Sequence, residues 1–366
     1  MAMALRCAEK AAGRTSPNPM VGAVVVKNGR VISRGWHKKA GEAHAEAIAL
    51  AKAGRYAKGA TLFVTLEPCS HSHKRTPPCS PLVIQSGVKR VVIAMIDPNP
   101  KVSGGGIRAI RKAGIEVVTG VLEAEARLLN EAFIKHVTKK VPLVTLKIAQ
   151  TLDGRIATSK GESKWITGDA AREEGHKLRD RNDAILVGIN TVLKDDPSLT
   201  TRIPKGRDPI RIIVDSRLRI PLNAKVLTQR STAKAVVAAL ASAPRTKVNC
   251  LRATGVEVLF VKNKAGRVDL RDLMKELGKQ DIMSVLVEGG AEINASALKA
   301  GIVDKVVMFI APTFMTGRDA LCAIGGSSPV KLDHAIRLSK VTAQFVGPDL
   351  KIEGYVMKKE GRKVGR

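Results

Sequence analysis

Four residues in the first hundred positions have the types and spacing of a metal-dependent hydrolase. His44 and Glu46 stand two residues apart in an alanine-rich segment, and Cys69 and Cys79 enclose a loop rich in His and Pro. Zn²⁺ favours about four tetrahedral nitrogen and sulfur ligands, and a catalytic site takes three from the protein and leaves one position to water. We therefore predict that His44, Cys69 and Cys79 bind zinc. Glu46 would lie beside that water and act as general acid/base.

A structural zinc site is the alternative interpretation of the same cluster. Structural sites close with a fourth protein ligand, which His71 or His73 could supply. Such a site would belong to a binding module without catalysis. The other three cysteines are isolated, and we expect them to be small buried side chains in a reducing compartment. They are Cys7, Cys250 and Cys322.

The segments around the zinc cluster alternate between strand and helix patterns over residues 1–140. We expect strands at 21–26, 31–34, 61–66, 88–96 and 115–118, and helices at 3–12, 43–53, 79–86, 107–113 and 123–136. The Asn28-Gly29 pair predicts a tight hairpin between the first two strands. This part is therefore predicted to be one α/β layered domain.

A second domain is predicted over residues 141–366, after a short junction that contains Pro142. We expect strands at 143–149, 184–187, 210–214, 235–239, 256–261, 284–287, 303–311, 341–346 and 350–356, and helices at 170–180, 270–277 and 291–300. Two domains suit a chain of 366 residues.

The second domain carries signals of anion binding but no G-x-G-x-x-G fingerprint. Glu288-Gly289-Gly290 ends an apolar strand pattern, and Ala291 begins a helix pattern. Glycines there let the backbone approach a pyrophosphate, and a helix N-terminus favours anions.

Composition restricts the class of partner. The chain has 62 Lys and Arg against 33 Asp and Glu, a net charge of +29. The excess is even, +14 in residues 1–140 and +15 in the remainder, and aromatic residues are only 3%. This argues against a specific nucleic-acid surface, which needs a focused patch and stacking side chains. No apolar stretch approaches the length of a membrane span and no signal peptide is evident, so we expect a cytoplasmic protein without membrane contact.

The motifs together resemble a known enzyme family. H-x-E followed by P-C-x-x-C is the signature of zinc deaminases, although here Cys79 comes ten residues after Cys69. The long loop ending in Thr-Pro-Pro-Cys is similar to that of the bifunctional deaminase–reductase family of riboflavin biosynthesis. The segments 15–24, 97–102, 146–155, 163–168, 184–193, 195–200, 213–216 and 287–291 match the same family. The resemblance covers nearly the whole chain.

The resemblance implies a fold, two reactions and two cofactors. The implied fold is a cytidine-deaminase-like three-layer α/β/α domain followed by a dihydrofolate-reductase-like α/β domain. Zinc-dependent hydrolytic deamination of 2,5-diamino-6-(5-phosphoribosylamino)pyrimidin-4(3H)-one would precede reduction of its ribosyl group by NADPH. A dimer or tetramer is also implied. A tRNA-type zinc deaminase is one alternative, favoured by the net charge and the H-x-E motif. A monofunctional reductase with a degenerate zinc domain is the other, since the loop between the cysteines is one residue longer than the common family form.

The resemblance also implies roles for individual residues. Substrate contacts are implied for Asn18, His37, His71, Asp97, Asn99, Ser163, Arg179, Leu199, Arg202 and Glu288. NADPH contacts are implied for Ala149, Trp165, Thr191, Asp195, Ser216, Gly290, Ala291, Glu292, Ile293, Asn294, Ala295 and Ser296. Which of Lys147, Asp153 and Asp195 assists hydride transfer stays open.

Overall fold

The computed structural model describes residues 1–70, 77–100 and 102–357. The chain divides into two compact units, Met1–Val141 and Pro142–Arg366. Each unit has its own main sheet, of five and nine strands respectively, and each has its own apolar core. None of the helices in the described residues has both the length and the apolar character needed to cross a membrane.

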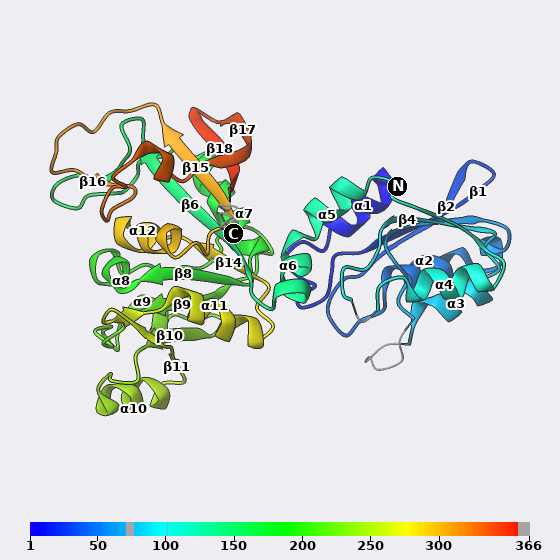
Figure 1. Cartoon of the computed structure of the whole chain (residues 1–366), viewed down its shortest axis with the longest axis horizontal. Helices are drawn as coiled ribbons and strands as arrows, with labels where there is room; N and C mark the ends of the chain where they lie inside the picture. The colour runs from blue at the N-terminus through cyan, green and yellow to red at the C-terminus, as the bar shows by residue number, and fades with distance from the viewer. Residues whose placement is uncertain (71–76, 101, 358–366) are drawn as a thin grey trace, which may run out of the picture. The chain divides into compact units, whose positions relative to one another are not determined.

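The first unit is a mixed five-stranded sheet between two layers of helices (Figure 1). Its sheet has the order β2-β1-β3-β4-β5, antiparallel in the first two pairings and parallel in the rest. The strands are β1 (Gly22–Lys27), β2 (Arg30–Trp36), β3 (Thr61–Leu66), β4 (Arg90–Met95) and β5 (Glu116–Thr119). The helices are α1 (Ala2–Glu9), α2 (Ala45–Ala53), α3 (Cys79–Gln85), α4 (Gly105–Lys112), α5 (Glu123–Leu129) and α6 (Glu131–Lys139).

Two glycines let helices approach opposite faces of this sheet. A Cβ at Gly22 would lie 2.0 Å from the Ala4 carbonyl oxygen of α1, and one at Gly35 would lie 2.4 Å from the Ala45 carbonyl oxygen of α2. The predicted hairpin is confirmed, with Asn28 and Gly29 both at positive φ, as its tight turn requires. The predicted layered α/β arrangement is confirmed as well.

One predicted helix of the first unit is wrong in extent. We expected a single helix over 123–136, but α5 ends at Leu129 and α6 begins at Glu131. The interruption is Asn130, whose buried side chain accepts a hydrogen bond from the Met20 N–H and donates one to the Met20 carbonyl. This long-range contact fixes Asn130 in a non-helical conformation, which local periodicity does not reveal.

The second unit is built on a nine-stranded sheet in the order β11-β10-β9-β8-β14-β6-β15-β18-β17. The strands from β11 to β15 run parallel, and β18 and β17 continue the sheet antiparallel (Figure 1). The strands are β6 (Leu143–Thr151), β8 (Ala184–Gly188), β9 (Ile210–Val214), β10 (Ala235–Ala239), β11 (Glu257–Phe260), β14 (Ser284–Val287), β15 (Lys305–Ala311), β17 (Leu338–Val346) and β18 (Asp349–Val356).

Six α-helices, a short 3-10 helix (Leu332–His334) and two small sheets complete the described part of the second unit. The helices are α7 (Asp169–Arg181), α8 (Ile189–Asp195), α9 (Lys225–Thr228), α10 (Arg245–Ala253), α11 (Leu270–Lys279) and α12 (Ala291–Lys299). The small sheets pair β7 (Arg155–Ala157) with β16 (Leu321–Cys322), and β12 (Asn263–Lys264) with β13 (Arg267–Val268). All five cysteines are free. Burial is confirmed for Cys7, but it is wrong for Cys250 and Cys322, which are exposed on a helix and an edge strand.

Candidate active sites

The fold brings the three predicted zinc ligands together. His44 precedes the first residue of α2, Cys79 begins α3, and Cys69 lies just after β3. Their ligand atoms all lie within 4.8 Å of one another. His44 Nδ1 is 3.1 Å from Cys79 Sγ and 3.6 Å from Cys69 Sγ. One nitrogen and two sulfurs on a tetrahedral Zn²⁺ would be separated by about 3.6 Å, so the donor set and its spacing fit the ion.

Glu46 lies beside these donors in the first turn of α2. Its side chain is buried, and this burial raises the pKa of the carboxyl above its ordinary value, against opposing effects of a backbone hydrogen bond and His44. A raised pKa suits a group that must both accept and donate a proton near neutral pH. Cys79 is buried too, and a hydrogen bond with Cys69 together with that burial raises the pKa of its thiol.

Two of the implied pyrimidine contacts adjoin the metal ligands. The Asn18 side-chain amide donates to His37 Nε2 at 3.0 Å, and His37 Nδ1 lies 3.2 Å from the Ala43 carbonyl oxygen. The rings of His37 and His44 meet edge to face with centroids 5.4 Å apart. His37 therefore connects Asn18 to the side of the zinc ligands, and its contact with the Ala43 carbonyl fixes the orientation of its ring.

The other implied contacts of the first unit follow β4. Asp97 is buried, and its carboxylate accepts a hydrogen bond from the Asn99 N–H at 2.9 Å. This contact closes a turn that holds both side chains on the loop between β4 and α4. His71, along with His73, lies outside the described residues.

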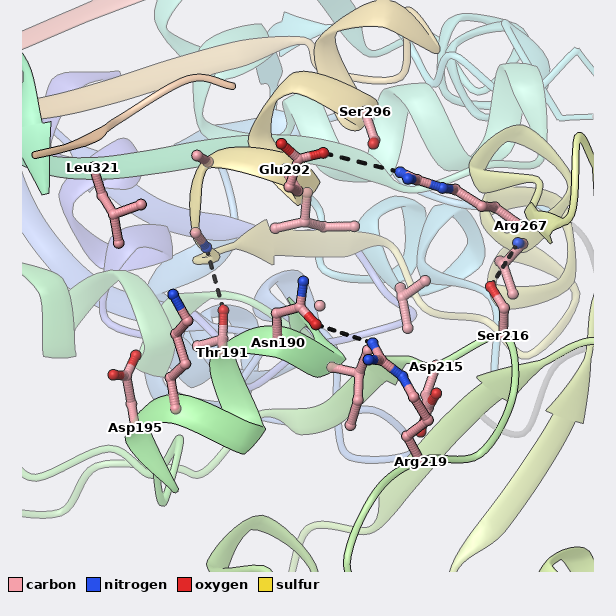
Figure 2. Close-up of a pocket in the computed structure, with 18 of the residues that line it drawn as sticks. Asn190, Thr191, Asp195, Asp215, Ser216, Arg219, Arg267, Glu292, Ser296 and Leu321 are labelled. Atoms are coloured by element: carbon pink, nitrogen blue, oxygen red, sulfur yellow. Dashed lines mark hydrogen bonds and ion pairs between the residues drawn. The ribbon is translucent and has the colours of Figure 1, made fainter. Parts of the chain in front are cut away.

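The second unit contains a cavity of about 560 Å³ at the carboxyl ends of β8 and β9 and the start of α12 (Figure 2). Ligands of open α/β sheets bind at this end of the strands. Figure 2 shows Thr191 beside the first residues of α12, where its hydroxyl accepts a hydrogen bond from the Gly290 N–H at 3.3 Å. On the opposite wall the Ser216 hydroxyl accepts one from the Val268 N–H at 3.1 Å.

Most implied NADPH residues line this cavity. They are Thr191, Asp195, Ser216, Gly290, Ala291, Glu292, Ile293 and Ser296, and the implied substrate contact Ser163 lines it as well. A Cβ at Gly289 would lie 1.9 Å from Ile293 Cγ2, so the backbone before α12 can pack this closely only with glycine.

Four implied NADPH residues have other surroundings. Asn294 and Ala295 are buried on the inner side of α12, where the Asn294 amide donates to the Ala323 carbonyl. Ala149 packs in a small apolar cluster on β6. Trp165 is 62% exposed, and the Arg172 guanidinium lies over its ring at 4.7 Å.

Sequence reasoning missed three arginines of the cavity wall. Arg217 and Arg219 follow β9, and Arg267 begins β13. The Arg219 guanidinium donates to Asn190 Oδ1 at 2.9 Å, and Arg267 lies 4.0 Å from Glu292 (Figure 2). The available signal was the Ser-Arg-Leu-Arg run directly after a strand.

The turn that carries two of these arginines is organised by Asp215. Its fully buried carboxylate accepts a hydrogen bond from the Ile220 N–H at 2.8 Å. Burial raises the pKa of Asp215, and backbone hydrogen bonds from residues 217, 219 and 220 oppose that shift. The chain therefore wraps around one carboxylate while Arg217 and Arg219 extend outward.

Glu288 forms a largely buried ion trio with Lys147 and Arg179 at the end of β14. Lys147 Nζ lies 3.0 Å from Glu288 Oε1, and the Arg179 Nε and terminal nitrogen each donate to Oε2 at 2.7 Å. Burial alone would raise the pKa of Glu288, but Arg179 and Lys147 outweigh it and hold the value at about 2. Burial and the nearby Arg179 also lower the pKa of His176 to about 4.

The remaining implied substrate residues of this unit, and the hydride-transfer candidate Asp153, make contacts outside the trio. Arg179 also donates to the Thr200 carbonyl at 2.9 Å. Arg202 is exposed, and its N–H contacts His176. Leu199 is buried, and its side chain packs in the apolar core. Asp153 accepts from the Thr151 hydroxyl and from the N–H groups of Met315 and Thr316, which lowers its pKa to about 2.

Both units match established families. Residues 142–352 match the model described as RibD C-terminal domain. Residues 1–95 match the cytidine and deoxycytidylate deaminase zinc-binding region. The riboflavin biosynthesis protein RibD of Aquifex aeolicus is 47% identical, over 96% of either chain, and that of Escherichia coli is 41% identical, again over 96% of each.

Solved structures agree over the same length. RibD of Acinetobacter baumannii superposes with a TM-score of 0.87 at 36% identity, covering 98% of both chains. A diaminohydroxyphosphoribosylaminopyrimidine deaminase/5-amino-6-(5-phosphoribosylamino)uracil reductase of Thermotoga maritima superposes with a TM-score of 0.85 at 40% identity. It covers 98% of this chain and 97% of its own.

Proposed function

This chain belongs to the RibD family of riboflavin biosynthesis proteins, and from that membership we propose how its residues divide two reactions. It is a bifunctional enzyme, a zinc-dependent deaminase and an NADPH-dependent reductase. The deaminase domain is residues 1–140 and the reductase domain residues 141–366. The substrate is 2,5-diamino-6-(5-phosphoribosylamino)pyrimidin-4(3H)-one, and the final product is 5-amino-6-(5-phosphoribitylamino)uracil.

In the deaminase domain, His44, Cys69 and Cys79 hold the zinc. When bound, zinc would act as a Lewis acid that lowers the pKa of water and so provides a nucleophile near neutral pH. Glu46 takes the proton from that water and passes it to the departing amine at C2 of the pyrimidine. Its buried position in the first turn of α2, beside the three ligand side chains, supports this role and is the observation that carries the proposal.

The pyrimidine is bound by the polar side chains that surround the zinc ligands. Asn18, oriented through His37, hydrogen-bonds one edge of the ring. Asp97 and Asn99 recognise it from the loop after β4. His71 completes this set by family resemblance.

In the reductase domain, the cavity between α12 and the turn after β9 would hold NADPH, which when bound would supply hydride for reduction of C1′ of the ribosyl group. Thr191, Ser216 and the first turn of α12 would hold the ribose–pyrophosphate part of NADPH, because helix N-termini favour phosphate groups. We add Arg217 and Arg219 to the contacts that the family implies, as donors to the 2′-phosphate. Asp195 would contact the cofactor from the cavity wall, and the family resemblance implies further contacts from Trp165, Ala149, Asn294 and Ala295.

The ribosyl phosphate binds near the buried ion trio. Arg179 has five N–H donors, and three of them are directed to Glu288 and the Thr200 carbonyl. The remaining donors, with the exposed Arg202, bind the phosphate. Lys147, held by Glu288, faces the sugar, and Ser163 and the Leu199 backbone enclose it.

The enzyme works as a homo-oligomer in the cytoplasm. The outer strand β17 and the segment before it expose several large apolar side chains, with Phe345 79% and Val330 96% exposed. Apolar patches of this kind mark protein contacts, and a second copy covers them in a dimer or tetramer. Five free cysteines suit a reducing compartment.

Ammonia release from the diaminopyrimidine ribotide tests this proposal. The zinc-loaded chain should release ammonia without NADPH, and Glu46→Ala should not. NADPH oxidation should begin only after deamination and should survive in Glu46→Ala when the deaminated substrate is supplied. If the wild-type chain oxidises NADPH but releases no ammonia, it is a reductase only. If it shows neither activity, the proposal is refuted.

A further inference from the structure

We propose that Glu67 is a positioning residue for deamination. Its side chain joins the arm that carries Cys69, residues 67–69, to the loop that carries Asp97 and Asn99. The proposal rests on the deaminase function proposed above, and it concerns a residue that touches neither zinc nor pyrimidine.

The Glu67 carboxylate is buried and accepts four backbone hydrogen bonds from one segment. Oε1 accepts from the N–H groups of Gly106 and Ile107 at 2.9 and 3.2 Å. Oε2 accepts from those of Gly104 and Asp97 at 2.9 and 3.2 Å. A carboxylate has about four acceptor positions, so both oxygens are fully used within the protein. The negative charge also lies at the N-terminus of α4, where the helix dipole favours it.

The arm itself is held from its other side. The Glu67 N–H donates to the Met95 carbonyl at 3.0 Å, directly after the pairing of β3 with β4. The Ser80 hydroxyl lies 3.0 Å from the carbonyl oxygens of Pro68 and Cys69. Because α3 and β4 hold the arm, the Glu67 carboxylate transmits its position to Asp97 and to the start of α4.

The glycine run before α4 makes this contact possible. A Cβ at Gly106 would lie 1.8 Å from the Pro68 carbonyl oxygen, which is backbone and cannot move aside. At Gly105 the nearest atom is the Ser70 hydroxyl oxygen, 2.6 Å away on a side chain that can rotate. Two N–H groups of the first turn of α4 are directed to Glu67. The run therefore serves close packing of the loop on the arm rather than a phosphate cradle.

This arrangement places one carboxylate between the metal side and the substrate side of the site. Cys69 lies two residues after Glu67 in the chain, and the Asp97 N–H donates a hydrogen bond to the Glu67 carboxylate. A change at Glu67 should shift Asp97 and Asn99 relative to the zinc ligands. Pyrimidine binding should then weaken while the zinc ligands and Glu46 keep their positions.

Glu67→Gln in the full-length, zinc-loaded chain tests the proposal, since the amide keeps the shape and replaces one acceptor oxygen with a donor. We expect KM for deamination to rise at least about tenfold while kcat changes less than about threefold. Zinc per chain and the reductase kcat/KM on deaminated substrate should be unchanged. Hydrogen exchange of the 104–107 backbone amides should accelerate at least about tenfold. Glu123→Gln, on the surface of α5, is the control.

A merely structural role would lower thermal stability and the active fraction and leave KM as it is, and that result overturns the proposal. So does a loss of zinc that accounts for the loss of activity. If wild-type chain releases no ammonia, the deaminase function fails instead, and unchanged amide exchange in Glu67→Gln would separately refute the contact.

A pair of neighbouring substitutions covers the case in which Glu67→Gln does not fold. The methyl group added by Gly106→Ala would clash with the Pro68 carbonyl oxygen, so this substitution should raise KM for deamination in the same way. The methyl group added by Gly105→Ala would approach only the rotatable Ser70 hydroxyl, so that substitution should leave KM within about twofold. Equal effects of the two substitutions would refute the proposed packing of the loop on the arm.

Discussion

Replacing Glu288 by Gln should destabilise the reductase unit far more than an ordinary loss of a surface charge. Lys147 and Arg179 both direct their charges to this carboxylate, and their side chains are only 15% and 16% exposed. Gln cannot neutralise them, so two cations would remain buried without an acid between them. Removing one partner of a buried pair typically costs about 3–5 kcal/mol.

The pKa of Glu288 leads to a similar magnitude. It lies at about 2 in the folded protein, against an ordinary value of 4.5. At about 1.4 kcal/mol per pKa unit, this shift corresponds to about 3 kcal/mol of stability. Because the pKa is lowered by folding, the contribution is complete above pH 4.5 and is lost as the pH falls toward 2.

Calorimetry of the full chain measures this prediction. The unfolding transition that rises on adding NADPH belongs to the reductase unit. For a unit of this size about 1 kcal/mol shifts Tm by roughly 2–4 °C, so Glu288→Gln should lower that Tm by roughly 6–12 °C. The difference from wild type should be constant from pH 8 to about 5.5 and should narrow below pH 4.5.

Glu173→Gln is the matched control, because Glu173 pairs with Lys177 on the exposed side of α7. An exposed pair contributes about 1 kcal/mol or less. If both variants shift Tm equally, or if the Glu288→Gln difference grows as the pH falls, the reasoning from the buried trio is refuted.

Three further predictions concern the zinc site, the cavity and the first unit. Chelation should abolish ammonia release while NADPH oxidation with supplied deaminated substrate stays within about twofold, both measured in one sample; loss of both would contradict the division of labour. Arg217→Ala combined with Arg219→Ala should raise KM for NADPH at least about tenfold and leave KM for NADH unchanged, since charged hydrogen bonds contribute about 1.5–3 kcal/mol. The control is Arg245→Ala, on the exposed side of α10. An equal rise of KM for NADPH and NADH, or an equal effect of the control, would refute a 2′-phosphate contact. Asn130→Leu should destabilise the deaminase unit by about 1–3 kcal/mol in urea denaturation, because it leaves the Met20 N–H and carbonyl without their partner; unchanged stability would contradict the role assigned to that contact.

Local patterns were sufficient to predict the strands that are buried on both faces. The bounds of β3, β9, β10 and β14 agree with prediction residue for residue, because each is a short apolar run between polar or turn residues. Helices α8 and α10 were not predicted. Each has few buried residues, Ile189 and Val192 in the first and Val248 and Leu251 in the second, so the helical period is weak.

The two candidate sites differ in how far sequence could predict them. The zinc ligands were predictable because few residue types bind zinc, and their spacing has chemical meaning. Arg217, Arg219 and Arg267 were not, because arginine is common in a chain with 62 basic residues. Their significance depends on β9 and β13 meeting at one cavity, which only the fold determines.

The position of β6 in its sheet has a consequence for synthesis of the chain. β6 is the first strand of the second unit, yet its neighbours are β14 and β15, which begin at Ser284 and Lys305. About 130 residues must therefore be made before β6 finds a partner, which at about 5–20 residues/s takes roughly 7–26 s. The first unit pairs all its strands within residues 22–119 and completes its sheet while the centre of the second is still unpaired.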